Sequence, residues 1–157
     1  MPPEIRPLAD DAEAQTCATI MGTSDPWITL GRTFDRCLAV ARDTELERYV
    51  AIDNGEVVGF ILVSMRGTFT GYVKSIAVRE DWRGRGLGSA LLAFAEQRIF
   101  RDTPNVFICV SSFNPRAQAF YARAGYEVVG DLRDFIARGY DERLLRKTIG
   151  PLTEFRS

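Results

Sequence analysis

Apolar residues recur along this chain with two periods, which together predict alternating strands and helices. Spacings of three and four residues predict helices at residues 10–22, 34–43, 89–99 and 115–124. Short runs rich in β-branched and aromatic residues predict strands at residues 5–8, 49–52, 57–65, 72–78, 105–112, 126–131 and 142–148. The resulting order, β-αα-βββ-α-β-α-β-β, indicates a single α+β domain over residues 1–157.

Turn and cap residues support several boundaries of these elements. Asn54-Gly55 stands between two β-rich runs and predicts a hairpin, because both turn residues need a positive φ. Asn114 is a favourable helix N-cap and Pro115 fits the first helical position. Gly125 then marks the end of that helix.

An anion-binding loop is predicted directly after the strand at residues 72–78. The segment Arg83-Gly84-Arg85-Gly86-Leu87-Gly88 separates that strand from a helical pattern that starts at Ser89. Its glycines uncover backbone N–H groups, and the helix N-terminus adds unpaired donors and the positive end of a dipole. The combination favours a phosphate or pyrophosphate, with two arginines at the rim. A mobile glycine turn is the plainer interpretation.

Two common nucleotide-binding motifs do not match this loop. A Walker loop requires GxxxxGK[ST], and Ser89 stands where its second glycine belongs. The dinucleotide fingerprint GxGxxG also requires glycine at that position. Neither class of nucleotide site is therefore expected.

The loop and a second segment together resemble the GNAT N-acetyltransferases, which transfer acetyl from coenzyme A to amines. The family signature Gln/Arg-x-x-Gly-x-Gly/Ala is matched by Arg83, Gly86 and Gly88. Residues 114–126, NPRAQAFYARAGY, resemble the downstream family segment N-x-x-A-x-x-[FL]-Y-x-[KR]-x-G-[FY]. The resemblance covers roughly residues 5–149. It implies a mixed, mostly antiparallel sheet of about seven strands with four helices, which splays to admit pantetheine.

The resemblance assigns a set of residues to acetyl-CoA. The pantetheine arm is expected along the strand and the pyrophosphate in the loop, and the Val78 region is expected to donate a backbone N–H to the thioester carbonyl. Asn114 would bond pantetheine amides, and Arg123 would meet the 3′-phosphate or face solvent. The full implied set is Ile76, Ala77, Val78, Arg83, Gly84, Arg85, Gly86, Leu87, Gly88, Ser89, Asn114, Tyr121 and Arg123.

Tyr121 is the candidate catalytic acid. A phenol with a pKa of about 10 stays protonated at neutral pH and can donate to a developing thiolate of pKa about 8.5. By spacing alone, Tyr121 is more readily interpreted as a core aromatic on the face of its helix. The motif around it favours the catalytic role.

No general base is assigned from the sequence. Family members carry a glutamate at the position of Tyr72 or at that of Cys109, and this chain has a carboxylate at neither. The remaining options are a water relayed by backbone carbonyls, Tyr72 itself, or an acid from a loop, such as Glu142 or Asp134. A cysteine in an apolar strand is usually unreactive.

The acceptor amine is expected between residues 25–30 and a loop predicted at residues 134–141. Aromatic walls and acidic groups in these segments suit an ammonium, although ordinary turns contain the same residue types. The candidates are Asp25, Trp27, Tyr72, Phe135, Asp134, Tyr140 and Asp141. The acceptor, a small-molecule amine or a peptide amine, is not determined.

The composition of the chain argues against several classes of partner. The net charge of −1 argues against nucleic acid, and the N-terminal residues show neither a signal pattern nor an apolar span for a membrane. Three widely spaced cysteines suggest reduced thiols in the cytoplasm, and no metal site is expected in a chain without histidine.

Three functions remain in competition at this stage. The leading one is an acetyl-CoA-dependent N-acetyltransferase. An acyl-CoA-binding sensor without turnover is the second, favoured by the missing carboxylates, and a transferase of longer acyl groups is the third. Family members often form homodimers, but no apolar stripe in this sequence singles out an interface.

Overall fold

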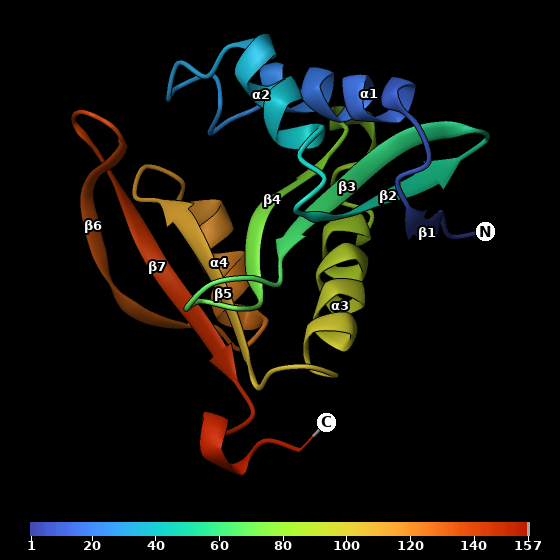
Figure 1. Ribbon diagram of the computed structural model, residues 1–157. Coiled ribbons are helices and arrows are strands. Elements are labelled where there is room, and N and C mark those ends of the chain that lie inside the picture. The colour runs from blue at the N-terminus through green and yellow to red at the C-terminus, as the bar shows by residue number, and fades with distance from the viewer. Residues whose placement is uncertain (157) are drawn as a thin grey trace.

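The protein is built on one seven-stranded sheet, seen in Figure 1, in a computed structural model that describes residues 1–156. Its strands, in chain order, are β1 Glu4–Pro7, β2 Glu47–Asp53, β3 Glu56–Ser64, β4 Tyr72–Val78, β5 Asn105–Ser111, β6 Glu127–Ala137 and β7 Tyr140–Thr148. The spatial order is β1-β2-β3-β4-β5-β7-β6. Neighbouring strands are antiparallel except β4 and β5, which are parallel.

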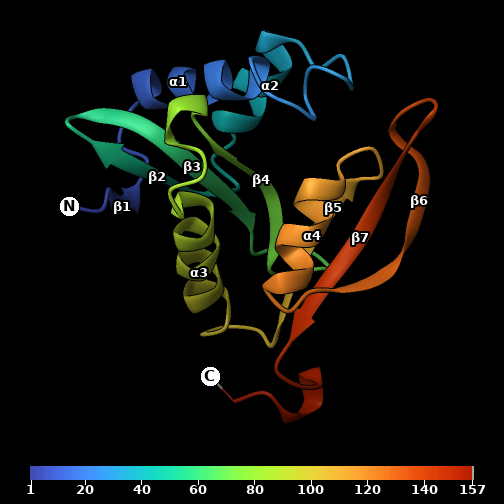
Figure 2. The ribbon, with the colours of Figure 1, turned by 180° about the vertical axis from the view of Figure 1, so that it is seen from behind.

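Helices cover both faces of the sheet. They are α1 Asp11–Gly22, α2 Phe34–Ala41, α3 Leu87–Ile99 and α4 Pro115–Arg123, with short 3₁₀ turns at Glu80–Trp82 and Leu152–Glu154. α1 and α2 lie on one face, whereas α3 and α4 lie on the other and stand in front of the strands in Figure 2. Side-chain caps begin three of them: Asp10 accepts from the Glu13 N–H, Thr33 from the Arg36 N–H and Asn114 from the Ala117 N–H.

Strand β3 explains why the first half of the sheet is buried on both sides. Its residues Val58, Ile61 and Val63 belong to the core under α3 and α4. Its residues Val57, Phe60 and Leu62 belong to the core under α1 and α2. A strand buried on both faces reads as a continuous apolar run, as VVGFILV does here.

The sheet separates between β4 and β5. The two strands pair only at Tyr72↔Phe107 and Val73↔Ile108, and beyond these positions no β4–β5 pairing continues in the described chain. Gly71, with φ +91°, stands immediately before this short ladder, and its carbonyl accepts from the Phe107 N–H at 3.0 Å. The free strand edges beyond it border the gap that Figure 1 shows between the two halves.

The predicted architecture of seven strands and four helices is confirmed, with two corrections to its details. The third helix begins at Leu87, two residues before the predicted Ser89, because left-handed Gly86 already acts as its N-cap. The loop predicted at residues 134–141 is a β-hairpin, since β6 continues to Ala137 and β7 starts at Tyr140. Most of this hairpin is exposed, so its sequence lacks the apolar alternation of a half-buried strand.

We predict that Gly71→Ala lowers the stability of the fold. A Cβ at residue 71 would overlap the Asn105 carbonyl oxygen and lie 2.8 Å from Ile99 Cγ2, in a backbone conformation that alanine rarely adopts. Strain and overpacking together should cost about 3 kcal/mol or more. Thermal unfolding should therefore begin roughly 6–12 °C lower.

Gly67→Ala is the matched control for this experiment. Gly67 also has a positive φ, of +83°, but its Cβ would meet nothing within 4 Å. The expected cost is about 1 kcal/mol, from backbone conformation alone. Equal losses in the two variants would contradict a close approach at Gly71.

Candidate active site

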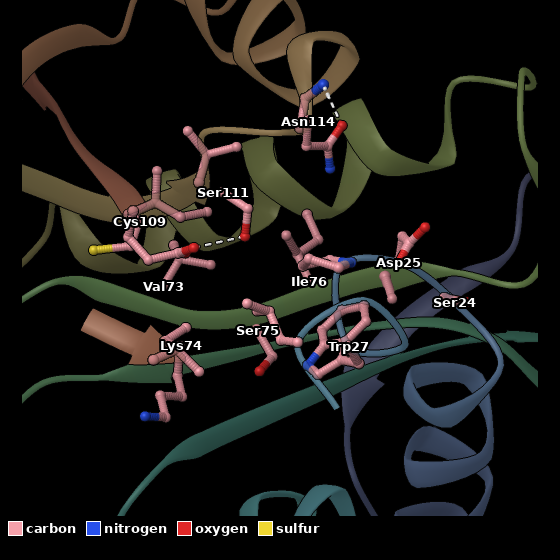
Figure 3. A pocket seen from close by; sticks show the side chains of 18 of the residues that line it. Ser24, Asp25, Trp27, Val73, Lys74, Ser75, Ile76, Cys109, Ser111 and Asn114 are labelled. Carbon is pink, nitrogen blue, oxygen red and sulfur yellow. Dashed lines mark hydrogen bonds between the residues drawn. The ribbon is translucent and has the colours of Figure 1, made fainter. Parts of the chain in front are cut away.

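A cavity of about 620 Å³ occupies the gap between β4 and β5. Its walls come from the α1–α2 connector, β4, β5, the first turns of α4 and the β6–β7 hairpin. Figure 3 shows the labelled side chains of β4 below the cavity, Asn114 above it and Trp27 at its side. Segments far apart in the sequence thus meet around one space.

The glycine loop takes a shape suited to an anion. Gly84 and Gly86 have φ values of +76° and +82°, and Gly86 is the N-cap of α3 without any side-chain cap. The first turn of α3 contains no acidic residue. Its unpaired N–H groups and the helix dipole therefore face outward at the exposed loop. These are the features of a phosphate-binding helix N-terminus.

Backbone groups of β4 line the cavity beside this loop. Arg79, the residue after β4, donates its N–H to the Val58 carbonyl on β3. Successive N–H groups point to opposite edges of a strand, so those of Val78 and Ile76 point away from β3 and toward the cavity. Both residues line it, as does Ala77. An extended chain carrying amide groups can pair with this edge.

Asn114 and Tyr121 bring α4 to the opposite wall. The Asn114 side-chain oxygen accepts from the Ala117 N–H at 3.2 Å, and its amide nitrogen is left for the cavity, as Figure 3 shows. Tyr121 is 5% exposed and lines the cavity, packed edge-on against Phe120 and Tyr126. Burial raises the pKa of Tyr121, so its phenol stays protonated at neutral pH.

The predicted arginines lie in three different environments. Arg83 lines the cavity, donating from Nη2 to the Ser24 hydroxyl at 3.0 Å and from Nε to the Val78 carbonyl at 3.3 Å. The Arg85 guanidinium stacks over the Trp82 ring at 4.5 Å, beside the glycine loop. Arg123 is exposed in the last turn of α4, outside the cavity. Their contacts with phosphate stay predictions.

The proposed acceptor residues are only partly brought together. Asp25, Trp27, Tyr72 and Phe135 line the cavity. Asp25 accepts from the N–H and hydroxyl of Thr29, and these bonds hold its pKa below the usual value. Tyr140, in contrast, is absent from the cavity wall and packs edge-on against Phe113.

The hairpin acids Asp134 and Asp141 also lie away from the cavity lining. Asp134 accepts from the Gly139 N–H and donates its own N–H to Asp141, so both carboxylates stabilise the hairpin. Their positions follow from the strand pairing that replaces the predicted loop.

Three titratable side chains share the inner wall of the cavity. Tyr72, Cys109 and Glu142 come from β4, β5 and β7, and all three line it. Burial raises the pKa of Tyr72 and of Cys109, so the first stays a phenol and the second a thiol near neutral pH. Glu142 is 3% exposed and accepts a hydrogen bond from the Ser111 hydroxyl at 2.6 Å.

Sequence reasoning missed several lining residues, among them Ser24, Arg32, Lys74, Ser111 and Arg116. Ser111 is the partner of Glu142 in the β5–β7 register. Alternation along β5 places Ser111 on the same side as Cys109, and this signal was present in the sequence. The pairing with β7 was not, because it depends on long-range register.

Across residues 1–156, no group of three or more acidic or cysteine side chains is arranged to hold a metal ion. Among the helices of the same residues, none has the length and apolar character needed to cross a membrane.

Comparison with known proteins identifies the family. The model of the acetyltransferase (GNAT) family matches residues 12–126, which is more than half of the chain. The chain belongs to the GNAT family of acetyltransferases. The match includes the glycine loop and all of the downstream motif at residues 114–126, so the resemblance to the family is confirmed.

Individual relatives share about a third of their residues with this GNAT chain, over part of its length. An uncharacterized N-acetyltransferase of Methanocaldococcus jannaschii is 37% identical over 101 residues, 63% of this chain and 64% of the relative. This chain therefore spans less than two thirds of that protein's length. An N-alpha-acetyltransferase of Sulfurisphaera tokodaii is 32% identical over 118 residues, 66% of this chain and 70% of the relative.

A solved structure of an aminoglycoside 6′-N-acetyltransferase complexed with coenzyme A has the same fold. Its TM-score is 0.75, with 18% identity and coverage of 94% of this chain and 98% of the other. At this identity, the likeness establishes the fold.

We predict that an alkylating reagent such as iodoacetamide labels the native GNAT chain slowly and at Cys109 alone. Cys17 and Cys37 are 0% and 2% exposed, whereas Cys109 lines the cavity. Because the pKa of Cys109 is raised above 9.0, little thiolate exists at pH 7.5, and the labelling rate should still rise above pH 9. Mass spectrometry of the intact protein would follow the single adduct.

The Cys109→Ser variant is the control and should stay unlabelled over the same time. Coenzyme A should slow labelling of the natural protein by occupying the cavity. Rapid labelling at pH 7, as fast as free cysteine, would mean that Cys109 is a thiolate and would contradict the buried environment described here.

Proposed function

We propose that this protein is an acetyl-CoA-dependent N-acetyltransferase that acetylates a primary amine by direct attack within a ternary complex. The observation that carries this proposal is one cavity lined by the free edge of β4, by Arg83 at the start of the glycine loop, and by a wall of aromatic and acidic side chains. A diphosphate cofactor and an amine therefore have complementary surfaces on either side of a single space.

The cofactor would lie along β4. Its pyrophosphate would accept from the N–H groups of residues 84–89, at the N-terminus of α3. Its pantetheine amides would pair with the free edge of β4, opposite the Asn114 amide. The thioester carbonyl would then accept from a backbone N–H near Val78. Donors placed in this way stabilise the oxyanion of the transition state by about 3 kcal/mol each.

The reaction follows from this placement. The neutral amine attacks the thioester carbon, a C–N bond forms, and collapse of the tetrahedral intermediate breaks the C–S bond. Tyr121 donates a proton to the departing sulfur, and the amine nitrogen loses one in return. The raised pKa of Tyr121 keeps that proton available at every pH near neutral.

The acceptor is a primary amine of a small molecule or of a peptide. Trp27 and Phe135 offer aromatic surface, and the Asp25 carboxylate stays ionised to attract an ammonium. Both acceptor classes occur among the similar proteins, one acting on aminoglycosides and another named as an N-alpha-acetyltransferase. Unpaired cysteines are consistent with work in a reducing cytoplasm.

A second candidate is an acyl-CoA-binding sensor without turnover. Tyr72 and Cys109 stand where family members carry carboxylates, and this departure favours the sensor. A transferase of longer acyl groups is the third candidate, governed by the space beyond Val78.

The test is an assay of free-thiol release from acetyl-CoA. The acceptors would be polyamines, amino acids, aminoglycosides and peptides with varied N-termini. Release with one class is the expected result and would name the acceptor class. Binding of acetyl-CoA by calorimetry without release from any acceptor would instead support the sensor, and faster release from longer acyl-CoAs would support the third candidate.

We predict that Tyr121→Phe lowers kcat at least about 100-fold, the usual size of an acid–base contribution, while the Kd of coenzyme A stays within about twofold. The hydroxyl of Tyr121 has no hydrogen-bond partner among the described residues, and no described side-chain atom is both fully buried and unpaired. Its removal should therefore leave the thermal stability nearly unchanged.

Tyr126→Phe is the matched control. Tyr126 is a buried neighbour on the same cluster, and its hydroxyl donates to Glu96 at 2.8 Å. Removing that hydrogen bond should lower stability by about 1–2 kcal/mol and leave kcat largely intact. A Tyr121 variant that loses stability and cofactor affinity together would point to a packing role.

A further inference from the structure

Glu142 is a buried residue, and no positively charged side chain among residues 1–156 pairs with its carboxylate. It is the third residue of β7, opposite Ser111 on β5, and 3% of it is exposed. Its Oε2 accepts from the Ser111 hydroxyl, the hydrogen bond drawn at Ser111 in Figure 3. Since no described side-chain oxygen is both fully buried and unpaired, Oε1 is accessible from the cavity that Glu142 lines.

Glu142 has no counter-ion. None of the ion pairs formed by residues 1–156 includes it. The adjacent Arg143 is turned to Asp131 and Gln118. Lys74 and Arg116 line the same cavity without pairing with Glu142. A buried, unpaired carboxylate is costly for a fold, and such groups concentrate at functional sites.

We propose that Glu142 is the general base of acetyl transfer, through a carboxylate that takes a proton from the ammonium of the acceptor. This assignment rests on the proposed N-acetyltransferase function. The acceptor R–NH₃⁺ loses one proton to Glu142, and the resulting R–NH₂ forms the C–N bond as the C–S bond breaks. The second amine proton balances the one that Tyr121 gives to the sulfur. Glu142 then releases its proton to solvent, which accounts for the single proton produced per turnover.

The environment of Glu142 suits proton acceptance better than that of the other acids. Burial raises its pKa above the ordinary 4.5, and the Ser111 hydrogen bond offsets part of the rise. Tyr72 on β4 and Cys109 on β5 lie near enough for the charge of Glu142 to raise their pKa values, and Lys74 on β4 and Arg116 on α4 line the same cavity. A raised pKa of the carboxyl group brings it closer to the pKa of the acceptor ammonium, about 8 for an α-amine or about 10.4 for an alkylamine, and this favours proton transfer to Glu142.

The alternatives are less suitable as bases. Tyr72 and Cys109 are held in their protonated forms by burial. Asp25 is exposed, and its bonds to Thr29 lower its pKa, which makes it a weaker proton acceptor. Asp134 is occupied at the hairpin and lies outside the cavity. Of the described carboxylates, only Asp25 and Glu142 line the cavity.

The first experiment compares the pH dependence of kcat/KM in the natural chain and in Glu142→Gln, with the amine found by thiol release. Glu142→Gln should lower kcat/KM at least 100-fold at pH 7.5 and abolish the acidic limb of the profile. The Kd of coenzyme A should stay within twofold. Glu127→Gln, which changes an exposed carboxylate of β6, is the matched control and should change neither.

Ser111→Ala tests the same assignment without removing the carboxylate. Loss of the hydrogen bond that lowers the pKa of Glu142 should shift the acidic limb to higher pH, with activity recovered at alkaline pH. An acidic limb that stays in place in Ser111→Ala, or that survives in Glu142→Gln, would overturn Glu142 as the base. Absence of thiol release from the natural chain with every amine would overturn the proposed function itself.

Stability separates this role from a structural one. The folded chain binds the proton of Glu142 more tightly than the unfolded chain, so this group stabilises the fold below pH 4.5, and that contribution is lost as pH rises through the folded pKa. At pH 8, Glu142→Gln should therefore unfold at the same temperature as the natural chain or higher. A lower unfolding temperature together with lost activity would overturn the proposal in favour of a structural carboxylate.

Discussion

The short ladder between β4 and β5 is the constraint on which the rest of the molecule depends. Two parallel pairs hold the strands together at one end, and the approach is close enough that only glycine fits at residue 71. Past this point the right-handed twist of each half is free to carry the strands apart. Backbone N–H and C=O groups that would otherwise pair within the sheet are thereby left unpaired and available to a ligand. Leaving such groups unpaired costs free energy unless a ligand or water bonds to them.

This separation also explains why the helices are placed as they are. α3 begins beyond the far end of β4, after the glycine loop, whose first residue, Arg83, lines the cavity. α4 begins at the far end of β5 and carries Tyr121 to the opposite wall. Arg83 then joins the two sides of the mouth, because its guanidinium bonds both the β4 carbonyl of Val78 and Ser24 of the α1–α2 connector. One side chain thus links the proposed cofactor side to the proposed acceptor side.

Local signals in the sequence predicted most of the fold. The turn at Asn54-Gly55, the helix ends at Pro115 and Gly125, and the glycine loop are each determined by a few consecutive residues. The hairpin of β6 and β7 was different. Its two strands were predicted in part, but most residues of its tip, 134–141, are exposed, so no hydrophobic period distinguished the tip from a loop. The pairing that forms the tip is set by tertiary contacts.

The residues of the candidate site also differ in whether local sequence or long-range strand pairing places them. Residues within motifs, such as Gly86 and Asn114, were predicted because the motif itself is local. Tyr140 was placed in the acceptor pocket because residues 134–141 were predicted to form one loop, but Phe135 lies on β6 and Tyr140 on β7, and only Phe135 lines the cavity. Ser111 and Glu142 met only through the β5–β7 register, which the sequence does not specify.

That register bears on the two departures from the family pattern. Tyr72 and Cys109 occupy the positions at which the family resemblance leads one to expect a glutamate, and both lie close enough to Glu142 for its charge to raise their pKa values. A carboxylate is therefore present at the same wall of the cavity, supplied by the next strand of the sheet. Because β7 pairs with β5 through seven residues, Glu142 is held in place as firmly as a residue on β5 itself. From the sequence alone, the absence of carboxylates at residues 72 and 109 favoured a sensor without turnover. That argument is weaker once Glu142 of β7 is found beside β5 at the same wall.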